Sequence, residues 1–111
     1  MDVAHDVFAV LADPTRRRLL EALASGERSV NELVRRVDIE QPGVSRHLRI
    51  LEEAGFVLVR PDGQRRWYSL RTQPFEALAD WMGSVARDQA NRLERLADLV
   101  EGPEKKKGKK P

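Results

Sequence analysis

The sequence contains no cysteine among its 111 residues, which excludes disulfide frameworks, iron–sulfur clusters and thiolate metal sites. It has only two histidines and no glycine-rich phosphate loop, so it offers neither a nucleophile with its base nor a metal-activated water. No apolar run is long enough for a signal peptide or a membrane span. These absences predict a cytoplasmic protein that is not an enzyme, has no membrane partner and needs no cofactor.

The net charge of +2 conceals an uneven distribution of basic residues. All five lysines lie in the last seven residues, within the segment GPEKKKGKKP, which has no apolar content. We therefore expect one folded domain over residues 1–101 and a disordered, lysine-rich tail over residues 102–111. Within the body, the basic stretch lies between residues 41 and 71, where there are six arginines and three carboxylates.

Four helices are predicted in the first half of the chain from apolar residues at helical spacing and from capping signals. They cover residues 3–12, 14–26, 29–37 and 41–54. Asp13 is a good helix cap and Pro14 is favoured at a first helical position. Ser29 and Glu32 have the spacing of a capping box. The third and fourth helices, joined by a tight turn, form a predicted helix-turn-helix.

The second half of the chain predicts a β-hairpin and one long helix. Residues 56–60 and 65–70 are rich in strand formers, and Pro61-Asp62-Gly63-Gln64 between them has the composition of a turn. The helix from Pro74 to about Val100 has apolar residues at alternating steps of three and four, a seam that needs a partner. Its seam residues are Phe75, Leu78, Met82, Val85, Leu93, Leu96 and Val100. The predicted fold is mainly α with a small β-hairpin (α+β), a winged helix-turn-helix in the order ααααββα.

The fourth helix has one apolar face and one polar face when it is placed on a wheel at about 100° per residue. Val44, Leu48 and Leu51 fall on the apolar face, and the opposite face has hydrogen-bond donors and no carboxylate before Glu52. Such a face fits the major groove of DNA, where arginine recognises guanine and glutamine recognises adenine. The residues predicted to read bases are Gln41, Ser45, Arg46 and Arg49.

The hairpin adds positive charge beside this face, which favours DNA binding over an ordinary solvated helix surface. The residues predicted to contact DNA from the hairpin are Arg60, Gln64, Arg65 and Arg66. His47 lies at the edge of the apolar face, and both a phosphate contact and a bond to the backbone are open for it. Arg16, Arg17 and Arg18 are interpreted as a solvated cluster, with a phosphate contact as the alternative.

The segments LADPTRRRLLEAL and SVNELVRRVDIEQPGVSRHLRILEEAGFVLVRPDGQRRWYSL resemble the ArsR family of winged-helix transcriptional regulators. The pattern S-x-H-L-x-x-L-x-x-A-G before a basic hairpin carries the resemblance, and the last helix is similar to that of the SdpR-like branch. The resemblance implies that the fourth helix reads an operator and that the first and last helices form a homodimer. It adds Val3 and Val7 to the predicted dimer interface.

Many members of that family sense metal through a Cys-x-Cys pair in the third helix. The matching positions in this sequence are Ser29, Val30 and Asn31, so those ligands are absent. The last helix offers carboxylates without a histidine, which is a poor set for a transition metal. We predict no metal ligands within the folded chain, with an intersubunit site that includes His5 left open.

The predicted function is sequence-specific binding of double-stranded DNA, by a homodimeric repressor or autorepressor at an inverted-repeat operator. An activator remains an alternative, because the effect on transcription depends on where the operator lies. A winged-helix protein-interaction module controlled by a regulatory partner protein is the other alternative. The lysine tail is open to two interpretations, a solubilising end or a source of non-specific phosphate attraction.

Overall fold

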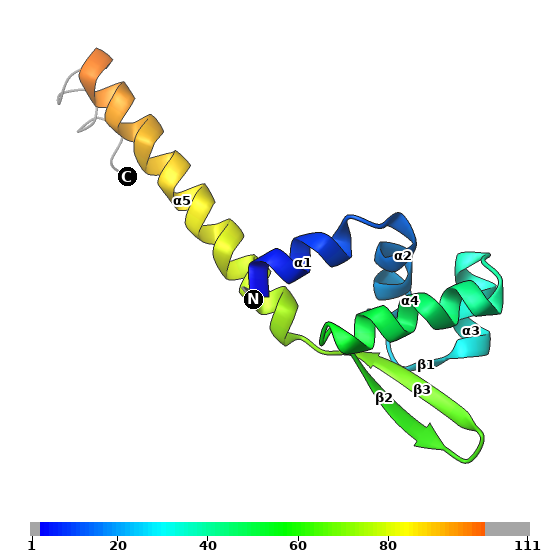
Figure 1. Cartoon of the computed structure of the whole chain (residues 1–111). Coiled ribbons are helices and arrows are strands. Elements are labelled where there is room, and N and C mark those ends of the chain that lie inside the picture. The colour runs from blue at the N-terminus through cyan, green and yellow to red at the C-terminus, as the bar shows by residue number, and fades with distance from the viewer. Residues whose placement is uncertain (1–2, 102–111) are drawn as a thin grey trace. The chain divides into compact units, whose positions relative to one another are not determined.

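The computed structural model describes the backbone of residues 3–101 and the side chains of residues 7–100. The chain divides into two compact units, residues 1–78 and residues 79–111, which are described separately. The helices are α1 (Val3–Leu11), α2 (Pro14–Leu23), α3 (Val30–Val37), α4 (Gln41–Glu53) and α5 (Gln73–Glu101), and the strands are β1 (Arg28–Ser29), β2 (Val57–Asp62) and β3 (Arg65–Leu70) (Figure 1). The predicted tail lies outside the described residues.

The predicted capping signals are confirmed at two helix starts. The Asp13 carboxylate accepts hydrogen bonds from the backbone N–H groups of Thr15 (2.8 Å) and Arg16 (3.2 Å), at the N-terminus of α2. Ser29 and Glu32 form the reciprocal capping box of α3, with distances of 3.4 and 3.0 Å. These bonds satisfy donors that the first turn of a helix otherwise leaves without a partner, so they fix where α2 and α3 begin.

The sheet has three strands rather than the predicted two, in the order β1-β3-β2. The additional strand β1 pairs with β3 in antiparallel register, Arg28 with Tyr68 and Ser29 with Trp67. The hairpin turn is also shorter than predicted, because β2 continues through Pro61 to Asp62 and leaves a two-residue loop. That loop begins at Gly63, whose φ of 63° is a conformation that favours glycine.

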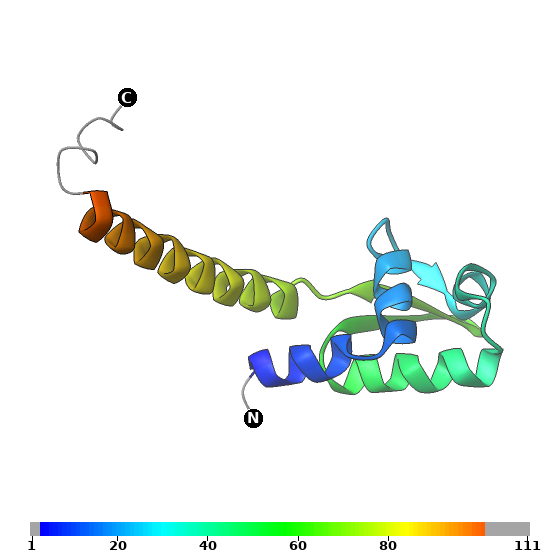
Figure 2. The ribbon, with the colours of Figure 1, turned by 90° about the horizontal axis from the view of Figure 1, so that it is seen from above.

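The core of the first unit lies where α1, α2, α3 and α4 meet the sheet, and Figure 2 shows α2 running across α4. Its largest fully buried side chains are Phe56, Leu19, Leu33, Leu48, Leu51, Val7 and Val44. Phe75, in the first turns of α5, packs edge-on against Phe56 with ring centroids 5.7 Å apart. Leu78 also packs against this core. The core therefore fixes α4 and the start of the hairpin in one rigid body.

The predicted dimer residues divide into two groups. The assignment of Val7 to the dimer interface is corrected, because its side chain is completely buried within the single chain and belongs to the monomer core. Phe75 and Leu78 are partly buried against the same core. In the second unit, α5 keeps its predicted seam at the surface, where Met82, Val85, Leu93, Leu96 and Val100 are each at least 41% exposed. The side chain of Val3 lies outside the described residues.

Candidate nucleic-acid interface

The polar face of α4 is at the surface, as the wheel predicts. Val44, Leu48 and Leu51 are fully buried and anchor the helix from below. Gln41, Ser45, Arg46 and Arg49 are all exposed on the opposite side. Burial of the apolar face therefore fixes the rotation of the helix about its own axis and turns these four side chains outward.

A cleft of about 410 Å³ separates α4 from the hairpin, which projects beside the helix in Figure 1. The cleft brings together six of the nine residues predicted to contact DNA, and these come from both elements. They are Gln41, Ser45 and Arg49 from α4, with Gln64, Arg65 and Arg66 from the hairpin. The site therefore joins a helix with hydrogen-bonding side chains to a basic wing. This arrangement suits a DNA duplex, in which a helix enters the major groove and basic side chains contact the phosphate backbone beside it.

Several cleft residues are not among the sequence-predicted site residues. Ser29, Val30 and Asn31 line it from the start of α3, and Glu52 lines it from the last turn of α4. The strand β1 explains the first three, because its pairing with β3 brings the N-terminus of α3 next to the hairpin. The capping box is the sequence signal for this position, since it places Asn31 in the first turn of α3. Glu52 is the one carboxylate among the residues that line the cleft.

Arg60, predicted to contact DNA, does not line the cleft. Its guanidinium donates two hydrogen bonds to the Glu27 carboxylate, Nε to Oε2 at 3.1 Å and Nη2 to Oε1 at 2.9 Å. The hydrogen bond from Arg60 lowers the pKa of the Glu27 carboxyl below its ordinary value, and the same bond raises the pKa of Arg60. Arg60 therefore has an anionic partner within the protein.

Arg46 and His47 are also outside the cleft. Arg46 is exposed on α4, whereas His47 is half-buried and its Nδ1 is buried with no hydrogen-bond partner in the described part of the chain. The pKa of the nearby Asp13 carboxyl is raised by partial desolvation but lowered overall by the N–H groups of Arg16 and Thr15 and by the charges of His47 and Arg16.

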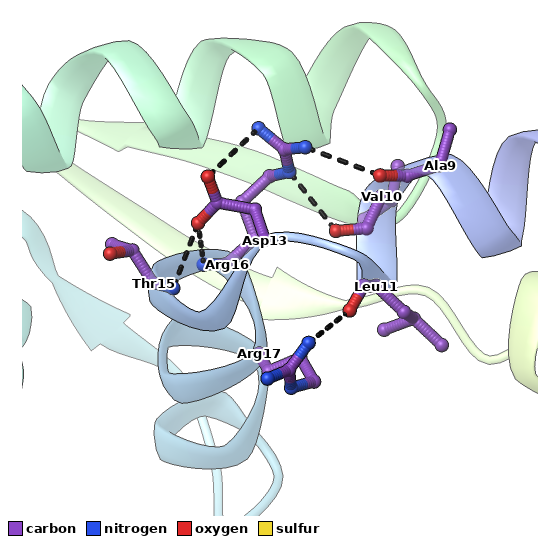
Figure 3. Close-up of polar contacts among 7 residues, drawn as sticks. All are labelled: Ala9, Val10, Leu11, Asp13, Thr15, Arg16 and Arg17. Carbon is purple, nitrogen blue, oxygen red and sulfur yellow. Dashed lines mark hydrogen bonds and ion pairs between the residues drawn. The ribbon is translucent and has the colours of Figure 1, made fainter.

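The arginines at the start of α2 have structural partners, as Figure 3 shows. Arg16 donates from Nε to the Val10 carbonyl at 3.1 Å and from Nη2 to the Ala9 carbonyl at 3.3 Å. Arg17 donates to the Leu11 carbonyl. These carbonyls end α1 and lack partners within the helix. The interpretation of residues 16–18 as a solvated cluster is therefore corrected for Arg16 and Arg17, which tie α1 to α2.

Among the described residues, no group of three or more histidine, cysteine, aspartate or glutamate side chains is placed to hold a metal ion. No helix within residues 3–101 is long and apolar enough to cross a membrane. His5, left open as an intersubunit ligand, has a side chain outside the described part.

The chain is similar to bacterial regulators along most of its length. Residues 13–58 match the family described as bacterial regulatory protein, arsR family. The transcriptional repressor SdpR of Bacillus subtilis is 33% identical over 78 residues, which cover 70% of this chain and 87% of that protein. A probable mercury resistance operon repressor of Streptomyces lividans is 38% identical over 93 residues, 84% of this chain and 74% of that one. A solved ArsR family transcriptional regulator superposes with a TM-score of 0.73 at 29% identity, covering 80% of this chain and 98% of that chain.

Proposed function

We propose that this chain, which belongs to the arsR family of bacterial regulatory proteins and is a DNA-binding transcriptional regulator, acts as a homodimeric repressor. In this proposal it works in the cytoplasm, where bacterial DNA lies, and binds an inverted-repeat operator. The observation that carries the proposal is the cleft between α4 and the hairpin, which gathers donors from both elements on one surface.

Each side of the cleft has its own role in the proposal. Gln41, Ser45 and Arg49 read base edges in the major groove, since glutamine and arginine form paired hydrogen bonds with adenine and guanine. Arg65 and Arg66 bind phosphates at the side of the groove and set the register of the protein on the duplex. Arg46 extends the reading face beyond the cleft because it is exposed on the same helix.

The homodimer is proposed from the apolar seam of α5. Met82, Val85, Leu93 and Leu96 are exposed within a single chain, and an apolar stripe at coiled-coil spacing needs a second helix to remove it from water. A second copy of the same chain supplies that helix in a two-fold dimer. Such a dimer presents two recognition helices roughly 34 Å apart, one turn of B-DNA, and so prefers an inverted repeat.

The signal that releases the repressor from DNA does not act through a thiolate metal site in this chain, which has no cysteine. A regulatory protein partner, a small ligand and an intersubunit site that includes His5 are left as sources of the signal.

A titration tests the proposal directly. The purified chain is titrated against a duplex from its own promoter and against a scrambled duplex of equal length, at two salt concentrations and with or without Zn²⁺ and Ni²⁺. We expect preferential binding to the promoter duplex, unchanged by metal, and footprinting is expected to show two half-sites of opposite orientation. Equal affinity for both duplexes, or one asymmetric half-site, would refute sequence-specific binding or the dimer, respectively.

A further inference from the structure

Glu27 and Arg60 form a connection between distant parts of the first unit. The two residues are 33 positions apart in the sequence, and both nitrogens of the contact, Nε and Nη2, bind the two oxygens of one carboxylate. Two parallel hydrogen bonds fix the relative orientation of guanidinium and carboxylate, which a single contact does not. Asp62 also lies within 3.9 Å of Nη1 of Arg60.

The connection crosses the sheet. Glu27 directly precedes β1, Arg60 lies in β2, and β3 runs between these two strands. Trp67 of β3 pairs with Ser29 on one side and with Arg60 on the other. The Arg60 guanidinium lies 5.9 Å from the centre of the Trp67 ring, within the range of a cation–π contact. The ion pair thus spans the central strand and joins the residue that precedes β1 to β2.

We propose that Glu27 and Arg60 are a wing-positioning pair, which holds the hairpin at a fixed orientation to α3 and α4 instead of contributing charge to DNA. The expected effect of this pair on DNA binding rests on the proposed function. β1 leads directly into the capping box of α3, so a fixed β1–β2 geometry is a fixed wing-to-helix geometry. Arg65 and Arg66, in contrast, have no ion pair in the described part of the chain and line the cleft.

Removal of the Glu27 charge is expected to lower DNA affinity, the opposite of the usual effect of removing an acid. Removal of an acidic side chain near DNA ordinarily strengthens binding, because it removes repulsion from phosphates. If Glu27 positions the wing, Glu27→Gln instead weakens binding, and Arg60→Gln weakens it by a similar factor. We expect a loss of roughly two- to fivefold for each, the scale of an exposed ion pair, with the slope of log affinity against log salt unchanged.

The DNA arm of the experiment uses a duplex selected with the unaltered chain from a randomised library. Five variants are compared: Glu27→Gln, Arg60→Gln, the double variant of these two, the exchanged pair Glu27→Arg with Arg60→Glu, and the control Glu53→Gln. Glu53 is exposed on α4 and does not line the cleft. The double variant is expected to lose no more than either single variant, and the exchanged pair is expected to recover affinity. Higher affinity for Glu27→Gln would overturn the proposal, because Glu27 would then act only through repulsion of phosphates. A shallower salt slope for Arg60→Gln would also overturn it, because Arg60 would then be a phosphate contact.

A second arm measures amide hydrogen exchange in the free chain and needs no DNA. Both side chains are exposed, so the variants are expected to remain folded. We expect exchange in β2 and β3 to accelerate by at least about twofold in both single variants, with the α2 and α4 core amides unchanged. Unchanged exchange in the hairpin, or equal acceleration in the core, would overturn a local positioning role. If the unaltered chain selects no duplex, the proposed function fails, and the exchange result still decides whether the pair positions the wing.

Discussion

The double replacement Arg65→Gln with Arg66→Gln is the most informative test of the wing. Both side chains are exposed, both line the cleft, and neither has an ion pair in the described part of the chain. Each arginine that neutralises a phosphate releases condensed counterions, which steepens the fall of log affinity with log salt by about 0.9. A dimer with two wings therefore makes four such contacts, and their loss reduces the slope by about 3.6.

The expected difference is large enough to measure by fluorescence anisotropy with a labelled duplex. When salt rises from about 50 to 200 mM, a slope difference of about 3.6 means that the unaltered chain loses roughly a hundredfold more affinity than the double variant. The variant therefore binds more weakly at low salt but loses less affinity as salt rises. Glutamine is shorter than arginine and has fewer N–H donors, so the change in salt slope, rather than the loss of affinity alone, reports the removed charge.

Arg36→Gln is the matched control, since Arg36 is an exposed arginine in the last turn of α3 and does not line the cleft. Its removal changes the net charge by one without removing a proposed phosphate contact. If the wing variant keeps the full salt slope, or if Arg36→Gln reduces the slope as much per charge, the assignment of phosphate binding to this wing is wrong.

Four further outcomes are expected. Arg49→Ala, in the cleft, is expected to cost about 1–3 kcal/mol of DNA-binding free energy and to relax the preference at one base pair. A uniform loss across sequences in a binding-site selection would instead make Arg49 a phosphate contact. Arg46→Ala is measured in the same way. Leu93→Glu is expected to yield monomers in analytical ultracentrifugation, and a variant that stays dimeric would contradict the assigned seam. Leu48→Ala is expected to cost about 2–5 kcal/mol in urea unfolding, because Leu48 is fully buried beneath the reading face, and a smaller loss would mean that α4 repacks. The lowered pKa of Glu27 gives stability that is present above about pH 4.5 and is lost as pH falls through the lowered value, so the melting temperatures of the unaltered chain and Glu27→Gln should converge in acid.

Local signals were sufficient to predict the helices and the exposed polar face of α4. The Asp13 cap and the Ser29 capping box act within three or four residues, and the structure has both. The orientation of α4 follows from the period of Val44, Leu48 and Leu51, which is also a local property. The order of the elements also follows from these local patterns, and the family match over residues 13–58 confirms the resemblance to the ArsR family.

Features that depend on distant partners were predicted less well. The strand β1 has two residues, too few for any period, and it exists because β3 pairs with it. Pro61 and Asp62 have turn composition, but they extend β2 because it is an edge strand, where a proline loses no hydrogen bond to a neighbour. Val7 was assigned to an interface from its family position, although its apolar side chain is equally suited to the monomer core that contains it.

The arginines of this chain show why local charge alone cannot define a DNA footprint. Arg16 binds the carbonyls that end α1, Arg60 binds a carboxylate across the sheet, and Arg65 and Arg66 line the cleft without an ion pair in the described part. In sequence all four are basic residues beside apolar segments, and only the acceptor that each one meets separates them. An arginine with an internal acceptor has fewer N–H groups left for a phosphate, and a carboxylate partner also offsets its charge, whereas Arg65 and Arg66 keep all their donors and their full charge among the described residues. The cleft arginines should therefore account for most of the salt dependence of DNA binding by the folded domain, and the others for the geometry in which it occurs.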